Sequence, residues 1–175
     1  MMSTTKHQHL VTTTWIIAKE LEVMSYPLDS LQLDSIFTSN PTQLDYSPII
    51  PASNDGLIAS CDGLLCFTIN QRLAVLYNPC IRKIKKLPFI DLPRVQGSTL
   101  YAFGYDPFID NYKVVAVFWY GSYHRAYKTQ VEVHTLGTDS WRRIKDFPSN
   151  VRLDRHGIFV SGTVNWLTYL LFEWF

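Results

Sequence analysis

Residues 57–68, LIASCDGLLCFT, indicate the fold class of the whole chain. Two apolar runs flank the pair Asp62-Gly63, and this pattern is a strong short-range signal for a β-hairpin with a tight turn. Two further strand-like runs follow at residues 73–77 and 82–87, and each ends at a proline-containing turn. Four short strands in succession predict one antiparallel sheet.

The same pattern returns further along the chain. Apolar runs that begin at residues 64, 114 and 164 are fifty residues apart, which matches the length of a kelch-type propeller blade. Residues 119–128 are interpreted as a long insertion between two strands of the second unit. In the second and third units, strands are predicted at residues 101–105, 113–120, 130–136, 141–147, 157–160 and 163–167.

These repeats predict an all-β chain, a partial kelch-like β-propeller built from about two to three four-stranded antiparallel blades. An open β-sandwich is the alternative. The uninterrupted apolar run at residues 114–119 fits a propeller, because a strand in a central blade is covered on both faces. Trp141 is expected to pack between neighbouring blades, as an aromatic residue in a half-buried sheet.

The first fifty residues have a weaker pattern. Residues 15–17 and 21–24 fit two short strands, but residues 15–24 also fit one helix that ends before Pro27. We therefore divide the chain into an N-terminal linker or strand segment, residues 1–50, and a β domain, residues 51–175.

Composition narrows the functional classes. Apolar residues make up 47% of the 175 residues and aromatic residues 14%, which suits a globular β protein. The net charge of +1 offers no field that would gather nucleic acid or an anionic membrane. Three cysteines are too few for a disulfide framework, and no signal peptide precedes them, so a soluble intracellular protein in the cytoplasm, the nucleus or both is expected.

Catalytic residues are not predicted. His124, His134 and His156 occur together with Ser140 and Asp139, but a chain of this length offers such a combination by chance. Nucleophile-elbow, phosphate-loop and zinc-protease patterns are missing from the sequence. No metal site and no cofactor are predicted either.

A protein-binding surface is predicted on the segment 120–127, because loops on rigid β scaffolds carry recognition and because tyrosine and arginine are enriched at binding hot spots. An ordinary solvated loop whose tyrosines pack on the blade is the alternative. The candidate binding residues are Tyr120, Tyr123, His124, Arg125 and Tyr127.

An ordered set of short phrases carries a family resemblance. It covers roughly residues 56–167, and it is preceded by MSYPL at residues 24–28. Together the phrases resemble the plant F-box-associated interaction domain. They are SCDGLLC (60–66), YNPCIRK (77–83), KLP (86–88), FGYD (103–106), DNYKVV (110–115), VEVHTL (131–136), DSWRRI (139–144) and GTVNWL (162–167).

The resemblance implies a function. In that family an F-box binds a Skp-type adaptor of a cullin ubiquitin ligase, and the β domain that follows selects the protein to be ubiquitinated. The chain is therefore expected to be the non-catalytic substrate-recognition module of such a ligase. Its expected partners are a target protein and, if a longer product carries an F-box, a Skp-type adaptor.

Two departures from the family pattern matter. No F-box is recognised before Lys6, and the sequence after Trp166 differs from the family pattern. We therefore expect a truncated domain that lacks further blades, has marginal stability and self-associates. The alternatives are a stand-alone or degenerate interaction fragment without ligase coupling and, more remotely, an enzyme on a kelch-type scaffold.

Overall fold

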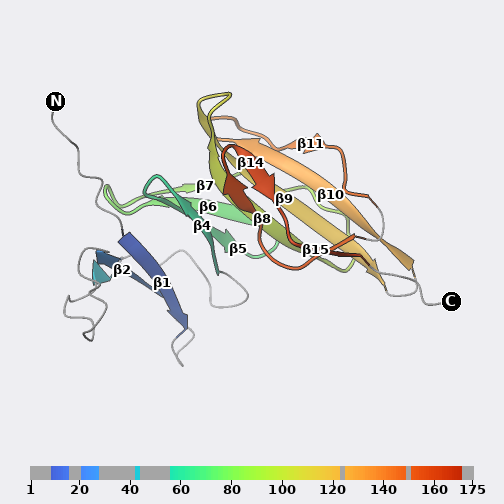
Figure 1. Ribbon diagram of the computed structural model, residues 1–175, viewed down its shortest axis with the longest axis horizontal. Coiled ribbons are helices and arrows are strands. Elements are labelled where there is room, and N and C mark those ends of the chain that lie inside the picture. Colours follow the sequence, from blue (N-terminus) through green and yellow to red (C-terminus); the bar gives the residue numbers. More distant parts are fainter. Residues whose placement is uncertain are drawn as a thin grey trace. The chain divides into compact units, whose positions relative to one another are not determined.

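The computed structural model describes residues 9–15, 21–27, 42–43, 56–122, 125–148 and 151–170 (Figure 1). The chain divides into two compact units, Met1–Asp55 and Gly56–Phe175. Each unit is described below by itself.

In the first unit, three strands form one antiparallel sheet in the order β1-β2-β3. They are β1 (His9–Trp15), β2 (Leu21–Pro27) and β3 (Thr42–Gln43). Trp15 pairs with Leu21, and His9 with Pro27. Of the two readings of this segment, strands are therefore correct and a helix over residues 15–24 is wrong, while residues 16–20 lie outside the described residues.

The second unit begins with a four-stranded meander, called here the first sheet. Its strands are β4 (Gly56–Cys61), β5 (Leu64–Ile69), β6 (Leu73–Asn78) and β7 (Lys83–Lys86), each antiparallel to the next. Asp62 and Gly63 have φ values of 48° and 78°, the left-handed pair that a type I′ hairpin turn needs. All four predicted strands of this sheet are confirmed.

The central sheet is a second meander. Its strands are β8 (Gly97–Asp106), β9 (Asn111–Ser122), β10 (Arg125–Thr135) and β11 (Arg142–Ile144), with the order β11-β10-β9-β8. Strands β9 and β10 are longer than predicted, and β11 is shorter. Pairing continues from Thr129↔Trp119 through Lys128↔Tyr120 and, after an irregularity, to Arg125↔Ser122. The expected insertion at residues 119–128 is therefore mostly strand.

A narrow two-stranded ribbon follows. Each of its two arms consists of two short strands. The first arm contains β12 (Val151–Leu153) and β13 (Ile158–Val160), and the second contains β14 (Thr163–Asn165) and β15 (Thr168–Leu170). Strand β13 pairs with β14, and β12 pairs with β15 outside them, with the Asp154 N–H donating to the Leu167 carbonyl between the two pairs. Ser161 and Gly162 turn the ribbon with φ values of 49° and 78°, close to those at Asp62 and Gly63. The predicted strands of the third unit are confirmed, and β12 and β15 were not predicted.

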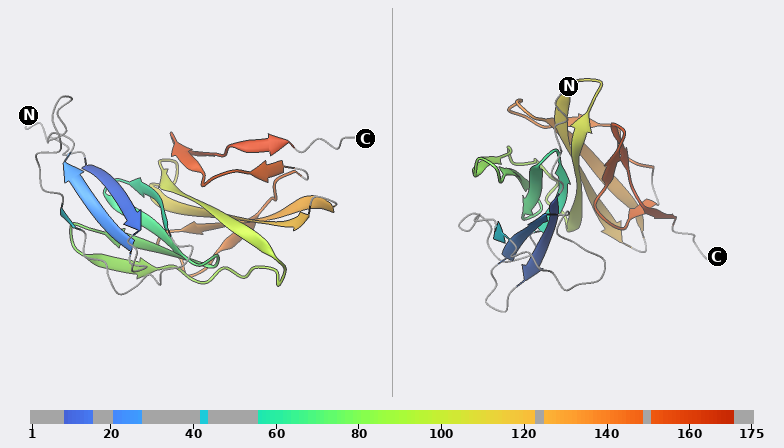
Figure 2. Two further views of the ribbon diagram at one scale, coloured as in Figure 1. Left: turned by 90° about the horizontal axis from the view of Figure 1, so that it is seen from below. Right: turned by 60° about the vertical axis from the view of Figure 1, so that its left-hand side comes forward.

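The central sheet lies between the first sheet and the ribbon (Figure 2). Alternate side chains of β9 point to opposite faces, as in any strand. Those that face the first sheet belong to a cluster of buried residues, which comprises Cys66, Ala74, Leu76, Leu87, Ile90, Leu92, Tyr101, Phe103, Val114, Ala116 and Phe118. Those that face the ribbon belong to a second cluster, which comprises Ala102, Val115, Val117, Val131, Val133 and Leu153. The prediction that this run is covered on both faces is confirmed.

Trp141 also lies where it was predicted. Its side chain packs against the cluster between the two sheets, and its indole N–H donates to the Pro88 carbonyl at 2.7 Å. Pro88 follows the last strand of the first sheet, so this hydrogen bond joins the outer strands of two blades.

The ribbon covers the central sheet incompletely. A groove of about 750 Å³ remains beside it, lined by Val115, Val131, Ile144, Lys145, Asp146, Phe147, Pro148, Val164 and Trp166. Contact is close elsewhere: the Gly157 N–H donates to the Tyr101 carbonyl at 2.8 Å, and Phe159 lies directly over Gly104. The chain is thus all-β, with two complete blades of a partial β-propeller and a ribbon beside them.

The part of the chain with described coordinates contains strands and turns and no helix. Among these residues, accordingly, no helix is long and apolar enough to cross a membrane.

Candidate protein-binding surfaces

The turn between β8 and β9 projects two apolar side chains. Phe108 is 87% exposed and Ile109 is 47% exposed. The turn itself is firmly held, because the Asp106 carboxylate accepts from the Phe108 N–H at 2.9 Å and also contacts the Lys113 ammonium. The contact with Lys113 and, after it, the hydrogen bond from Phe108 lower the pKa of Asp106 below its ordinary value. Large apolar side chains on a rigid turn are typical of a contact surface.

Neighbouring turns lie against this one. The Tyr112 hydroxyl donates to Asp62 Oδ2 at 3.2 Å, which connects β9 to the turn after β4. On the other side, a Cβ added at Gly162 would stand 2.8 Å from Pro107. The first-hairpin turns of both sheets and of the ribbon therefore meet at one end of the unit, and we call this the turn end.

Two tyrosines reinforce the turn end. Tyr105 donates its hydroxyl to Asp110, and its ring packs edge-on against Tyr112 with centroids 5.4 Å apart. The hydrogen bond to Asp110 raises the pKa of Tyr105, and burial followed by the nearby Asp62 charge raises the pKa of Tyr112. Both hydroxyls therefore stay protonated and act as donors. The sequence motifs FGYD and DNYKVV contain these residues, but their meeting with Asp62 depends on blade packing.

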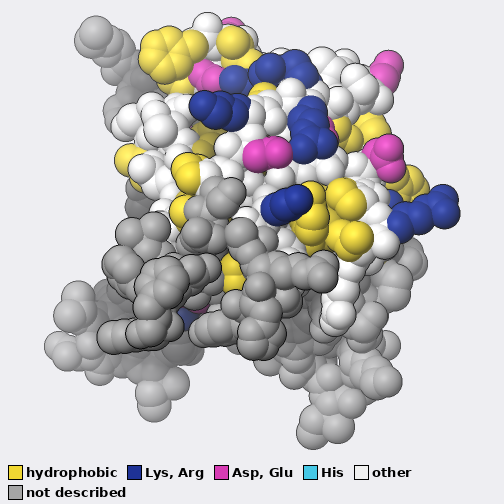
Figure 3. All heavy atoms as spheres, turned by 90° about the vertical axis from the view of Figure 1, so that its right-hand side faces the viewer, with side chains coloured by type: hydrophobic (Ala, Val, Ile, Leu, Met, Phe, Trp, Pro, Cys, Tyr) yellow, Lys and Arg dark blue, Asp and Glu magenta, His cyan; other side chains and the backbone are white. Residues whose placement is uncertain are grey.

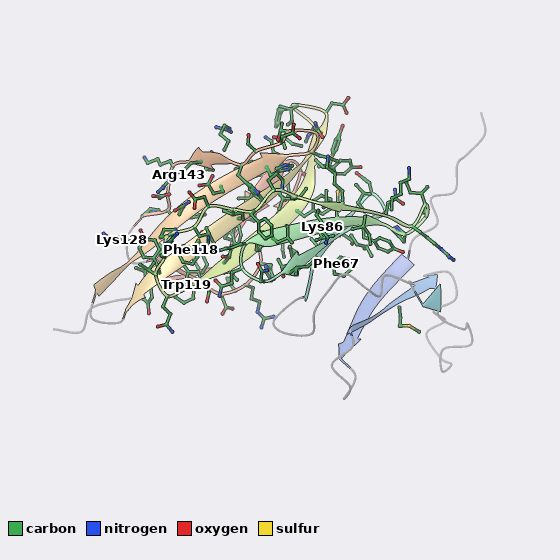
Figure 4. The ribbon with its side chains drawn as sticks, turned by 180° about the vertical axis from the view of Figure 1, so that it is seen from behind. Phe67, Lys86, Phe118, Trp119, Lys128 and Arg143 are labelled. Atoms are coloured by element: carbon green, nitrogen blue, oxygen red, sulfur yellow. The ribbon has the colours of Figure 1, made fainter. Side chains whose placement is uncertain are left out.

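Two of the predicted binding residues, Tyr120 and Tyr127, lie at the opposite end of the central sheet. Tyr120 is in β9, is partly buried and stacks on Phe118 with centroids 5.5 Å apart. Tyr127 is in β10, only 8% exposed, and packs edge-on against Trp119 at 5.5 Å. Figure 4 shows Phe118, Trp119 and Lys128 toward this end, which we call the hairpin end.

The other three predicted residues are less fully described. The backbone of Arg125 begins β10 and pairs with Ser122. Tyr123 and His124 lie outside the described residues. The structure therefore places Tyr120 and Tyr127 as packing residues of the hairpin and brings Arg125 to its tip.

The surface in Figure 3 is mixed in character. Side chains of both charge signs lie among hydrophobic ones, and no large area of one sign is seen on this face. Such a surface suits a protein partner better than a polyanion.

His134 and His156 contact backbone groups. His134 is 1% exposed, and its Nε2 lies 3.1 Å from the Thr138 carbonyl. His156 Nδ1 accepts from the Tyr101 N–H at 3.0 Å. Burial lowers the pKa of both imidazoles, so both are neutral near pH 7. His124 belongs to the residues without described coordinates.

The cysteines are spread over different environments. Cys66 is fully buried, Cys61 is partly buried and Cys80 is exposed, and all three are free thiols. Burial raises the pKa of Cys66 far above that of an ordinary thiol, so it packs as a small apolar group. Across the described ranges, no three His, Cys, Asp or Glu side chains come together in a way that could hold a metal ion.

Comparison with known proteins finds similarity to F-box proteins of a plant. An F-box/kelch-repeat protein of Arabidopsis thaliana is 32% identical over 116 residues, which cover 63% of this chain and 31% of the relative. F-box protein CPR1 of the same plant is 28% identical over 161 residues, 80% of this chain and 38% of the relative. A putative F-box protein, also from Arabidopsis thaliana, is 29% identical over 161 residues, 87% of this chain and 41% of the relative.

The chain thus spans only about a third of the length of the curated relatives it matches, for example 31% and 30% of two of them. No solved structure matches it. A family model described as the F-box associated beta propeller domain matches residues 18–171, which is most of the chain and includes all strands of the two complete blades. The chain belongs to the family of F-box associated β-propeller domains.

Proposed function

We propose that the chain is a non-catalytic protein-binding module that selects a target protein for a Skp–cullin–F-box ubiquitin ligase. The observation that carries the proposal is the family match over residues 18–171, together with relatives whose names identify them as F-box proteins. Ubiquitin transfer takes place on other subunits, and the coupling to a Skp-type adaptor requires an F-box in a longer product. Such a ligase would act in the cytoplasm, the nucleus or both.

Recognition is assigned to the hairpin end. Tyr120 and Tyr127 are packed against Phe118 and Trp119, so they support the hairpin and limit its mobility. Tyr123 and His124, which lie between β9 and β10 in the sequence, and Arg125, the first residue of β10, are the residues proposed to contact the target. Aromatic packing next to a binding segment lowers the entropy that is lost when a partner binds.

The test of this proposal uses the chain fused behind a heterologous F-box. The fusion is reconstituted with the Skp-type adaptor and the cullin, and proteins ubiquitinated in a plant extract are identified by mass spectrometry of ubiquitin remnants. We expect at least one protein whose ubiquitination depends on the chain and decreases at least fivefold when Tyr123→Ala and Arg125→Ala are combined.

The matched control is the double exchange Ile109→Ala with Phe108→Ala at the turn end, which leaves the hairpin end unchanged. A chain-dependent target that is lost with this control, and kept without Tyr123 and Arg125, would move recognition to the turn end. A folded fusion that binds the adaptor and yields no chain-dependent ubiquitination would refute the module itself. If the chain without the fused F-box binds the same target protein, the chain would compete with its longer relatives for that target.

A further inference from the structure

A second cavity lies between the first sheet and the central sheet. Its volume is about 370 Å³, at the small end of ligand sites and sufficient for one side chain of a partner. Two segments line it: the stretch after β7, and strands β10 and β11 with the turn that joins them. We call it the acidic pocket, and the lining residues used below are Phe89, Asp91, Glu132, Asp139, Trp141 and Arg143.

Glu132 is the central group of the acidic pocket. Its side chain is buried, with 7% of the residue exposed. One carboxylate oxygen accepts from the Gln130 amide at 2.9 Å, and the same amide nitrogen donates to the Asp91 carbonyl at 2.8 Å. For the second carboxylate oxygen, the described residues supply no hydrogen-bond donor.

The second oxygen is not sealed in. Thr99 Oγ1 is the one fully enclosed side-chain oxygen without a partner in the described part of the chain, so the second oxygen of Glu132 is not fully enclosed, and Glu132 is one of the residues that line the acidic pocket. A largely desolvated carboxylate with half of its acceptor capacity unused favours a cationic donor.

Aromatic side chains line the same pocket as this carboxylate. The Trp141 ring is fixed by its hydrogen bond to Pro88 and by the ring of His134, whose centroid is 5.3 Å away. Burial lowers the pKa of His134, so this neighbour is neutral and does not compete as a cation. Phe89, which is 69% exposed, adds a second ring at the rim. A fixed indole beside a carboxylate is a favourable setting for a guanidinium group.

The charges around the acidic pocket also favour a cationic ligand. Asp91 and Asp139 are exposed at its rim, and Glu132 is inside. The cation in its lining, Arg143, donates to Asp146 at 2.9 Å. Lys85 of the neighbouring β7 is close enough to lower the pKa of His134 but does not line the pocket. The lining therefore holds three carboxylates and one guanidinium that already has an anionic partner.

We propose that the acidic pocket binds an arginine side chain of the target protein, with the guanidinium on the Trp141 ring and hydrogen-bonded to Glu132. That the arginine belongs to the target protein rests on the proposed function, whereas the preference for a guanidinium group rests on the residues that line the pocket. Arginine is favoured over lysine because its planar fork can stack on the indole and donate to a carboxylate at once.

The test is a titration of the full chain with the peptide acetyl-Gly-Arg-Gly-amide, followed by the Trp141 indole N–H signal in NMR. We expect a saturable shift with a dissociation constant of about 1 mM, since a single side chain contributes few atoms. The lysine peptide should bind several-fold more weakly, and the norleucine peptide should leave the signal unchanged. Equal shifts with arginine and norleucine would overturn the proposal.

Two variants locate the binding. Glu132→Gln keeps the shape of the side chain and should weaken the arginine peptide at least tenfold, while Asp139→Asn, on the exposed rim, should weaken it two- to threefold without risk to folding. Asp110→Asn at the turn end has the same change of charge and should bind normally. Unchanged binding in both pocket variants would overturn the proposal. No ligase takes part, so this outcome is separate from that of the ubiquitination test.

Discussion

The two layers that cover the central sheet differ in how deeply their own side chains are buried, although both faces of the central sheet itself are buried. Toward the first sheet, Tyr101 and Phe103 are 1% and 2% exposed, because four strands and the segment after them pack on this face. On the ribbon side, Ala102 and Val117 of the central sheet are 0% exposed, but Phe159, Val164 and Trp166 of the ribbon remain partly exposed. Alternating apolar residues therefore bury both faces of the central sheet, and the width of the covering layer decides how much of that layer is itself buried.

The largest expected effect separates the two faces directly. Phe103→Ala removes a fully buried ring and should cost about 3–5 kcal/mol of the free energy of unfolding. Phe159→Ala removes a ring at the partly covered face and should cost about 1–2 kcal/mol, since less apolar area returns to water. Urea denaturation followed by tryptophan fluorescence measures both. Equal losses would mean that the ribbon is as firmly packed as the first sheet.

A smaller effect is expected where the ribbon touches the central sheet most closely. A Cβ at Gly104 would stand 2.3 Å from the Phe159 ring, so Gly104→Ala should push the ribbon outward and cost about 1–3 kcal/mol. Hydrogen exchange at the Gly157 N–H, which is bonded to the Tyr101 carbonyl, should become faster.

The matched control is Gly56→Ala, where no atom lies within 4 Å of the added carbon. This exchange should leave both the urea midpoint and the exchange rate at Gly157 nearly unchanged. Combining Gly104→Ala with Phe159→Ala should restore part of the lost stability, and strict additivity would contradict the contact.

The smallest effect concerns pH. An amide N–H always donates, so His156 Nδ1 must accept from Tyr101 and the ring must be neutral when the ribbon is attached. Burial lowers the pKa of His156 below its ordinary value of 6.5. The unfolded chain therefore takes up this proton first as the pH falls. The stabilisation is complete above about pH 6.5 and is lost as the pH falls toward the folded-state pKa.

Thermal melts between pH 7.5 and 5 measure this contribution. His156→Asn retains an acceptor oxygen but does not titrate, so the melting temperature of this variant should decrease less over the same range. His134 has a lowered pKa as well and leaves a remaining slope in the variant. Identical pH profiles for both proteins would exclude His156 as a contributor.

The sequence was most informative where periodicity and turn chemistry agree. Asp62-Gly63 and Ser161-Gly162 predicted hairpin turns, and both pairs have the left-handed φ values that such turns need. The uninterrupted apolar run at residues 114–119 predicted a strand covered on both sides, and the two buried clusters confirm it. These features depend on residues that are close in sequence.

Features that depend on long-range packing were not predictable. The polar residues of 119–128 indicated a loop, yet the β9–β10 ladder continues through most of them because each strand pairs with the other. Strands β12 and β15 have only three residues each and, unlike β13 and β14, are not joined to each other by a tight turn that would mark them in the sequence. The acidic pocket combines Asp91 with Glu132 and Trp141 across two blades, and no pattern in the sequence connects these residues.

The nesting of the ribbon has a consequence for the order of folding. Strands β13 and β14 are joined by a two-residue turn, whereas β12 and β15 can pair only after the inner pair has brought them together. The ribbon is therefore expected to pair first next to the Ser161-Gly162 turn and then outward along its two arms, on the microsecond timescale of hairpin formation. In the two sheets, too, each strand pairs with its neighbour in sequence. As the chain leaves the ribosome, the first sheet can form early, and its apolar face remains uncovered until β8 and β9 emerge.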